Sequence, residues 1–522
     1  MADSEPFRLL DLPSEIFIHV LSFLSLESLC ASQQLSHFFH ETIRKSVLLQ
    51  YQIASAIAQV TDNSDCLSIS DRLLMLRASE SAFSQMKPSW TQTIHVPFLA
   101  AGLYELSGGL FFLGEHSRCA LRYVELPTEP PRAWEPPVPW KRLAVKAPKR
   151  IIDFGLAIDE HDLIVVATFN PADGGLASIV EGTVALEFLV MSTHQPHPEA
   201  QGPIEVYKSH WGMPNVILEL VGDHLVFVTA FPLQLASAPP DHVYVYEWRT
   251  GKIKMHIEAK NSTYFAAVFL STDMLLLPNA NTAMLELWPI ASEQTAPALC
   301  LRLPRLNPTA HFLYITARSE PNPALPHRPK RARAPFHPSA EDAIIVFHLM
   351  LRVHVGRPPA VYLLFTHRRA LLALLTAGGA SPRSYSEWGP DICRWLSGTG
   401  INTNWITTTS GQRCLLTVTA QPAPLFLADF NRTHFLQNTD PQKVWETGED
   451  QFAEHGVWAE PVASRLVCLL LNSEEKYAYD SASLDAERII AIRRVESTQA
   501  RAPIGIVEVL YFGQSRDAGE QH

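Results

Sequence analysis

The sequence predicts an α+β multidomain protein in which short helices precede one large all-β domain. Apolar residues from Leu9 to Ile43 recur at helical spacing, whereas from Trp90 onward they form short runs bounded by Gly, Pro, Asn and Asp. Proline accounts for 39 of the 522 residues. This share exceeds the usual level of about 5%, and it favours turns and strands over helices.

The stretch Leu9–Ile43 is expected to hold three short helices. Pro13 suits the first position of a helix because its φ is fixed and it has no amide hydrogen. Ser25 and Ser36 are placed to be the N-caps of the second and third helices. A unit of about forty residues cannot bury so many Leu, Ile and Phe side chains, because small units leave much of their surface open. We therefore expect another polypeptide to cover the surplus.

The order of these residues closely resembles the F-box. The resemblance is carried by LPSEI at Leu12–Ile16, VLSFL at Val20–Leu24, Leu29, and Leu35-Ser36 ahead of Phe39. It implies a helical module that docks on the Skp-type adaptor of a cullin-RING ubiquitin ligase. The residues implied to make or support this adaptor contact are Leu12, Pro13, Glu15, Ile16, Val20, Leu21, Leu24 and Leu29. The alternative is an ordinary helical bundle packed on the following domain.

Two further helices are expected between this module and the β domain. The apolar helical pattern continues through Ser46–Val60, and a second helix with the sequence DRLLMLRASESAF follows Ser70 as its N-cap. That second helix is similar to one that precedes a long β region in fungal F-box proteins. Such helices would fix the angle between adaptor and target, which a flexible linker could not do. The expected parts are an F-box at 9–45, linker helices at 46–89 and a β domain at 90–512, with flexible ends at 1–8 and 513–522.

The β domain is expected to be a degenerate β-propeller with six or seven blades. Its clearest strand is DHVYVYEWRTGK at Asp241–Lys252, where Val and Tyr alternate before a Thr-Gly turn. This strand resembles the closing strand of a WD-repeat blade. Trp248 and Trp288 lie 40 residues apart, which suits a four-stranded blade. Ile504–Phe512 is expected to pair with the first blade and close the ring. An irregular pair of β-sandwiches is the alternative.

Charge and cysteine content argue against several partners and sites. The net charge of -11 gives no reason to expect nucleic acid or an anionic membrane as a partner. The seven cysteines are scattered without a CxxC pair, which argues against a disulfide framework and a zinc site. No secretory signal or long apolar stretch is visible, so we expect a cytoplasmic or nuclear protein. The basic stretch around Lys330 suggests nuclear import or an acidic partner, and a solvated loop between blades is the simpler reading.

Catalytic motifs are missing at the spacing that they require. The sequence has no G-x-S-x-G elbow, no HExxH pair and no GxxxxGK[ST] loop. We therefore expect no catalytic residue, no cofactor and no metal. The resemblance to the F-box implies instead a subunit that recognises the substrate protein of a Skp/cullin/F-box type ubiquitin ligase. The substrate-binding residues are left open. Two other hypotheses remain: an F-box scaffold that acts without the ligase, and a propeller hydrolase with carboxylates in its channel.

Overall fold

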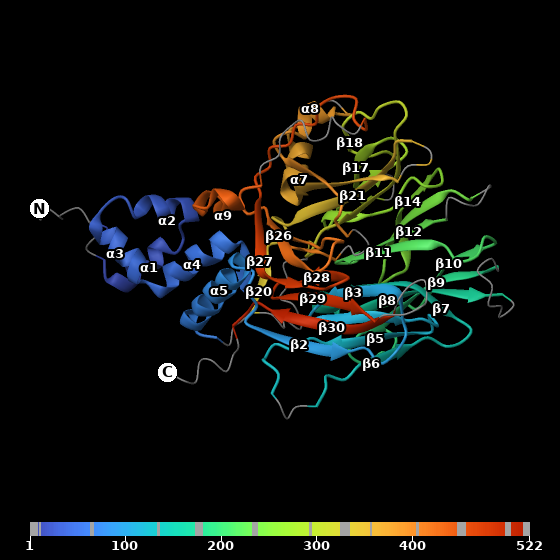
Figure 1. Cartoon of the computed structure of the whole chain (residues 1–522), viewed down its shortest axis with the longest axis horizontal. Coiled ribbons are helices and arrows are strands. Elements are labelled where there is room, and N and C mark those ends of the chain that lie inside the picture. Colours follow the sequence, from blue (N-terminus) through green and yellow to red (C-terminus); the bar gives the residue numbers. More distant parts are fainter. Residues whose placement is uncertain are drawn as a thin grey trace, which may run out of the picture.

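A group of helices stands at one end of a ring of β-sheets (Figure 1). The computed structural model describes residues 9, 12–62, 67–132, 136–172, 181–231, 238–291, 295–323, 335–354, 356, 358–379, 381–402, 407–445, 456–495 and 503–514. The basic stretch around Lys330 and both expected flexible ends, apart from residues 513 and 514, lie outside these ranges.

The helices at the N-terminus form where serine residues can cap them. They are α1 (Ser14–Leu21), α2 (Leu26–Ser32), α3 (His37–Lys45), α4 (Val47–Ala58) and α5 (Ile69–Ser84), and together they are called the helical module below. The hydroxyls of Ser25, Ser36 and Ser46 accept backbone N–H groups at the starts of α2, α3 and α4. The expected cap of α5 was wrong. Ser68 takes that place instead of Ser70, because its hydroxyl accepts the N–H of Asp71.

Seven four-stranded antiparallel sheets form the ring in the described part of the chain, which confirms the propeller and selects seven blades. The sheets are β3–β6 (Ala100–Ser107, Leu110–Glu115, Ala120–Glu125, Lys141–Ala144), β7–β10 (Arg150–Ala157, Leu163–Pro171, Gly182–Val190, Ile204–Ser209), β11–β14 (Asn215–Val221, His224–Ala230, Asp241–Glu247, Lys252–Ala259), β15–β18 (Val268–Ser271, Met274–Asn279, Met284–Pro289, Leu299–Arg302), β19 with β21–β23 (His311–Arg318, Ile344–Arg352, Ala360–His367, Cys393–Ser397), β24–β27 (Thr409–Ser410, Arg413–Leu416, Ala423–Asp429, Leu469–Tyr477) and β28–β30 with β2 (Ser481–Leu484, Arg488–Arg494, Ile504–Tyr511, Trp90–His95).

The ring closes through strands from the two ends of the β domain. The strand β30 pairs antiparallel with β2, from Tyr511 opposite Trp90 to Ile506 opposite His95. This confirms the expected pairing of the last strand with the first and removes two free sheet edges. Within the blade β11–β14, the strand β13 is the third of four and pairs with β14 on its outer side. The expectation that this sequence closes its blade was therefore wrong.

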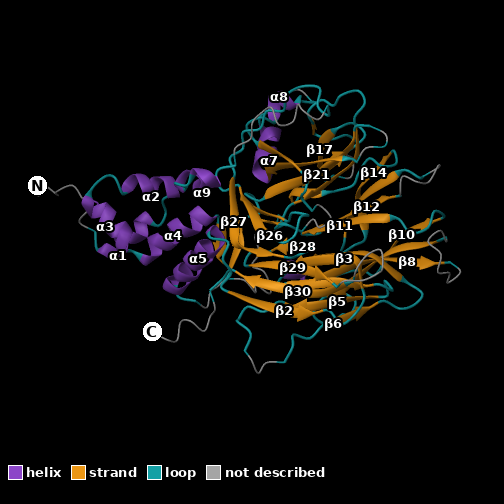
Figure 2. Cartoon of the chain, in the orientation of Figure 1, coloured by secondary structure: helices purple, strands orange, loops and turns teal. Residues whose placement is uncertain are grey.

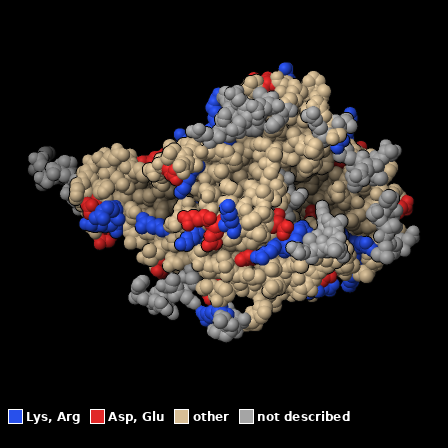
Figure 3. Space-filling view, in the orientation of Figure 1, with Lys and Arg blue, Asp and Glu red and all other residues tan. Residues whose placement is uncertain are grey.

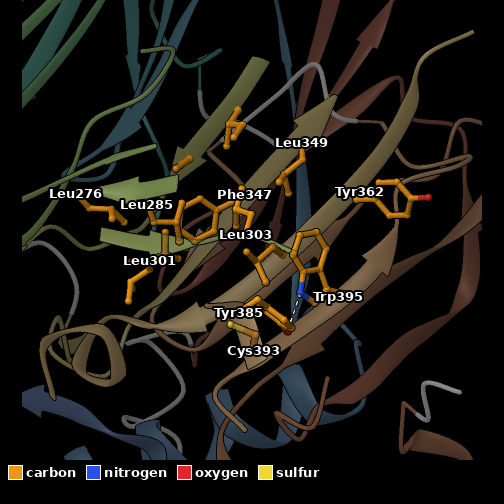
Figure 4. Close-up of a cluster of buried hydrophobic side chains, with 14 of the residues drawn as sticks. Leu276, Leu285, Leu301, Leu303, Phe347, Leu349, Tyr362, Tyr385, Cys393 and Trp395 are labelled. Atoms are coloured by element: carbon orange, nitrogen blue, oxygen red, sulfur yellow. Dashed lines mark hydrogen bonds between the residues drawn. The ribbon is translucent and has the colours of Figure 1, made fainter. Parts of the chain in front are cut away.

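Neighbouring blades bury apolar side chains between them. Figure 4 shows one such layer, where Leu276 and Leu285 of one blade pack with Phe347 of the next. Buried Trp395 donates its indole N–H to the Tyr385 hydroxyl at 3.0 Å, so its polar tip is satisfied. Four short helices are inserted between strands of the ring: α6 (Ile158–His161), α7 (Arg368–Thr376), α8 (Tyr385–Trp388) and α9 (Arg432–Gln437). Figure 2 labels the last three of them. Among the described residues, no helix has the length and apolar character needed to span a membrane.

Candidate functional site

The helical module has a small core of its own. Phe17, Leu21 and Leu29 are buried there together with Ile43 and Leu49, which come from α3 and α4. Leu12 is partly buried and packs against the same cluster. One face of α1 therefore points inward, as the spacing of its apolar residues predicts.

A neighbouring face of α1 and the turn after it leave large apolar side chains in solvent. Ile16 is 48% exposed and Val20 39%, at the i, i+4 spacing that places residues on one helix face, and Leu24, three residues after the end of α1, is 37% exposed. Phe23 beside them is 77% exposed. Of the fifteen large apolar side chains exposed in the described part of the chain, eight lie within residues 9–47: Leu9, Ile16, Val20, Phe23, Leu24, Leu35, Phe38 and Val47. We call these eight residues the apolar face. In Figure 3 the upper part of this end is mostly tan, whereas blue and red side chains gather on its lower side.

The residues implied by the resemblance divide into two groups. Pro13, Glu15, Ile16, Val20 and Leu24 are exposed and can touch a partner. Leu21 and Leu29 are buried in the core of the module, so they can only support such a contact. Sequence reasoning left out Leu9, Phe23, Leu35, Phe38 and Val47 as contact candidates. Phe23 follows the end of α1 at Leu21, so helical spacing could not have identified it.

A short sheet joins the helical module to the ring. At the end of α4, Gln59 has a φ of 52°, which turns the chain into β1 (Val60–Asp62). That strand pairs with β20 (Phe336–Pro338), and the N–H of Ser339 donates to the Gln59 carbonyl at 2.8 Å. The side-chain amide of Gln412 also donates to that of Gln59. The module is thus held by backbone pairing as well as by side chains.

The first half of the module matches a family model. Residues 9–53 match the family described as F-box-like, and the match includes the apolar face. Residues 9–53 form an F-box-like domain. No curated protein sequence matches the chain.

Solved structures that resemble the chain include propellers. The WD40 domain of Toxoplasma gondii coronin is 8% identical, with 82% of this chain and 88% of that chain covered and a TM-score of 0.39. The C-terminal WD40 domain of Sif2 is 10% identical, with 80% of this chain and 97% of that chain covered and a TM-score of 0.36. BamB from Moraxella catarrhalis is 11% identical, with 80% of this chain and 98% of that chain covered and a TM-score of 0.32. At these scores, the seven blades are assigned from the strand pairing of this chain alone.

A charged cluster lies where the helix after the F-box-like domain meets the ring. Arg413 of β25 binds the carboxylate of Glu80 in α5, and its Nε lies 3.7 Å from Oδ2 of Asp429 in β26. The guanidinium also lies over the ring of Phe83, 4.7 Å from its centroid. His434 of α9 completes the group. Charges from the module and from the ring therefore meet at one partly buried position.

A second candidate site is a cavity at the end of the ring that faces the F-box-like domain. Its volume is about 390 Å³, and it is lined by the last residues of β3, β7, β11 and β19 and by β1 and β20. Arg318 lies 2.9 Å from Glu105 and 2.8 Å from Glu320, and it also binds Glu219. Three carboxylates from three parts of the ring thus share one guanidinium.

Burial shifts the pKa values of the ionisable side chains around this cavity. Burial raises the pKa of Asp153, which lies near these groups, to about 7. Burial also raises the pKa of Glu320 to about 7 and lifts that of Glu219. Burial alone would lower the pKa of Arg318, but the surrounding carboxylates hold it well above its ordinary value. Glu105, Glu219 and Glu320 thus all form ion pairs with Arg318.

Metal binding and disulfide formation have no support among the described residues. They contain no group of three or more His, Cys, Asp or Glu side chains arranged to hold a metal ion. Six cysteines in this part of the chain are free: Cys30, Cys119, Cys300, Cys393, Cys414 and Cys468. The apolar face therefore remains the leading candidate for function.

Proposed function

We propose that the chain is the target-binding subunit of a Skp/cullin/F-box type ubiquitin ligase. In this proposal the F-box-like domain binds a Skp-type adaptor through its apolar face, and the propeller holds the protein to be modified. The observation that carries the proposal is the concentration of exposed apolar side chains on a domain that matches the F-box-like family. Exposed apolar clusters of this kind mark interaction sites.

Burial of these side chains by a partner would stabilise the contact. A fully buried Val, Leu, Ile or Phe side chain contributes about 1.5–3 kcal/mol relative to an exposed one. Ile16, Val20, Phe23 and Leu24 are all available for this gain. Part of it is offset by the loss of translational and rotational freedom on binding. The gain is made without unfolding the module, because its core consists of other residues, among them Phe17, Leu21 and Leu29.

The chain would contribute proximity and no bond-making chemistry of its own. Other subunits would transfer ubiquitin, and this chain would hold the target where they act. The junction through β1, β20 and Gln59 supports this role, because it limits how far the target can swing relative to the adaptor. The complex would act in the cytoplasm or the nucleus.

We place target binding at the end of the ring away from the F-box-like domain. The strands β3, β7, β11 and β19 end beside β1 and β20, so the loops that precede them open at the other end. Leu99 precedes β3, Trp211 precedes β11, and Val495 follows β29 at the same end. All three side chains are exposed. They would be the apolar part of the target surface.

The experiment is co-purification with the full chain as bait. The double substitution Ile16→Glu and Val20→Glu should abolish recovery of the adaptor and the cullin, because it puts charge on the apolar face. The matched control is Ile253→Glu, since Ile253 is also exposed but lies in β14. Circular dichroism should show all three proteins folded. Recovery of the adaptor without a cullin would replace the ligase with a scaffold role, and recovery of neither by the native chain would overturn the proposal.

A further inference from the structure

The imidazole of His434 lies between a carboxylate of the helical module and a carboxylate of the ring. Its Nδ1 is 2.9 Å from Oδ2 of Asp429 in β26, and its Nε2 is 3.5 Å from Oε2 of Glu80 in α5. A neutral imidazole has one N–H, so it can donate to only one of the two. A protonated imidazole has two N–H groups and can donate to both carboxylates.

We propose that His434 is a protonation-controlled latch between the helical module and the propeller. With a proton on each ring nitrogen, His434 binds Glu80 and Asp429 together. When one proton leaves, the contact across the junction to Glu80 is lost, while the contact with Asp429 inside the ring remains. This inference concerns the geometry of the chain and does not depend on which partner the F-box-like domain binds.

The charges in direct contact with His434 and Arg413 balance only when His434 is protonated. Glu80 and Asp429 supply two negative charges, and Arg413 supplies one positive charge. The second positive charge is that of protonated His434. Arg77 and Lys443 also line the groove beside the cluster, but neither forms an ion pair with these carboxylates. Loss of the His434 proton therefore leaves a partly buried excess negative charge, which is costly.

Solvent can reach the latch. The cluster opens into a groove of about 640 Å³ between α4, α5 and α9 on one side and β26 and β27 on the other. The His434 side chain is 19% exposed. Protons can thus exchange with bulk water without unfolding of the junction, and the groove leaves room for α5 to move.

The direction of the pH response follows from the two carboxylates. Burial lowers the pKa of His434, but the hydrogen bond and the charge of Asp429, with the charge of Glu80, raise it above 6.5 overall. A raised histidine pKa means that the latch contributes its full stability below about pH 6.5 and loses it as the pH rises through the raised value. The pKa of Asp429 is lowered, so Asp429 stays ionised throughout this range.

Other contacts keep the junction assembled when the latch opens. The pairing of β1 with β20 and the packing of Phe83 against the closing blade do not depend on a titratable group. Loss of the latch should therefore loosen α5 against blade β24–β27 rather than detach the module. The expected change is a wider range of angles between the F-box-like domain and the ring.

The test is a double-mutant cycle on the full chain with His434→Gln and Glu80→Gln. At about pH 6 the two substitutions should lower the melting temperature by less together than the sum of their separate effects, and at about pH 8.5 the two effects should add. The control cycle uses His210→Gln and Glu181→Gln, an exposed pair at 2.9 Å that lies away from the junction. Its coupling should be small at both pH values.

A second variant separates charge from shape. Lys keeps its positive charge across this range, so His434→Lys should remove the pH dependence. Small-angle X-ray scattering of the native chain should show a larger maximum dimension at about pH 8.5 than at about pH 6, and His434→Lys should show no such change. Equal coupling at both pH values, or an unchanged scattering profile in the native chain, would overturn the latch.

Discussion

The ring of Phe83 in α5 stacks on the ring of Phe512, with centroids 4.5 Å apart and planes inclined by 11°. Both side chains are buried. Because Phe512 directly follows β30, the stack joins the helical module to the blade that closes the ring. The helices and the propeller are therefore parts of one structural unit, and a change at this contact should alter the stability of both.

Replacing Phe83 with Ala should lower the free energy of unfolding by about 3–5 kcal/mol, because it removes a buried ring and leaves a cavity. Chemical denaturation of the full chain measures the loss. The control is Leu74→Ala on the same helix, where an exposed side chain should change stability by no more than about 0.5 kcal/mol. Equal effects of the two substitutions would show that the stack does not support the junction.

Adjacent residues of α1 should behave in opposite ways. Leu21 is 2% exposed in the core of the module, so Leu21→Ala should destabilise the chain by about 2–5 kcal/mol. Val20→Ala should leave stability within about 0.5 kcal/mol but weaken binding of a purified Skp-type adaptor. Thermal unfolding and isothermal titration calorimetry separate the two effects. The division of the module into core and apolar face fails if Val20→Ala unfolds it.

Replacing Arg318 with Met should cost about 3–5 kcal/mol of stability, because it leaves buried carboxylates without their shared cation. The matched control is Arg465→Met. Arg465 pairs with Asp391 at 2.7 Å, but both side chains are exposed, so the loss should be at most about 1 kcal/mol. Denaturation in guanidinium chloride compares them. A loss as small as that of the control would mean that water screens the cavity network.

Asp153 should make the native chain less stable as the pH rises. Its pKa is raised from 3.8 to about 7 in the folded chain, so the folded state holds a proton that the unfolded state has released between these values. Asp153→Asn removes this cost and keeps an oxygen that can accept the N–H of Phe154. The variant should melt at a higher temperature than the native chain at about pH 8 and at nearly the same temperature at about pH 4. Asp391→Asn, at an exposed carboxylate, is the control and should show no such pH dependence.

Local signals explain why the helices and many strands could be predicted. Ser25, Ser36 and Ser46 precede apolar runs at helical spacing, and each caps the helix that follows. The choice between Ser68 and Ser70 could not be made from residue type, because both are serines before the same run. The innermost strands were harder to predict. β24 is only Thr409–Ser410 and β28 is Ser481–Leu484, so neither shows the alternation of a half-buried strand.

The site could be predicted only where it is local in sequence. The apolar face is continuous enough in the chain for its spacing to be visible. The ion network is not, since Arg318 is separated from Glu105 by 213 residues and from Glu219 by 99. Such contacts arise from the curvature of the ring and the number of blades, which no short pattern determines. For the same reason the sequence did not indicate His434, whose partner Glu80 lies in another part of the chain.

Closure of the last blade also sets the order of events during synthesis. β2 leaves the ribosome long before β30, and translation of the residues between His95 and Ile504 takes roughly 20 to 80 s at about 5–20 residues per second. Throughout this interval the nascent chain carries an unpaired strand edge and a completed set of N-terminal helices. The N-terminal helices are therefore made long before the ring can close, and a ribosome that stops early leaves Phe83 without the closing blade on which it stacks.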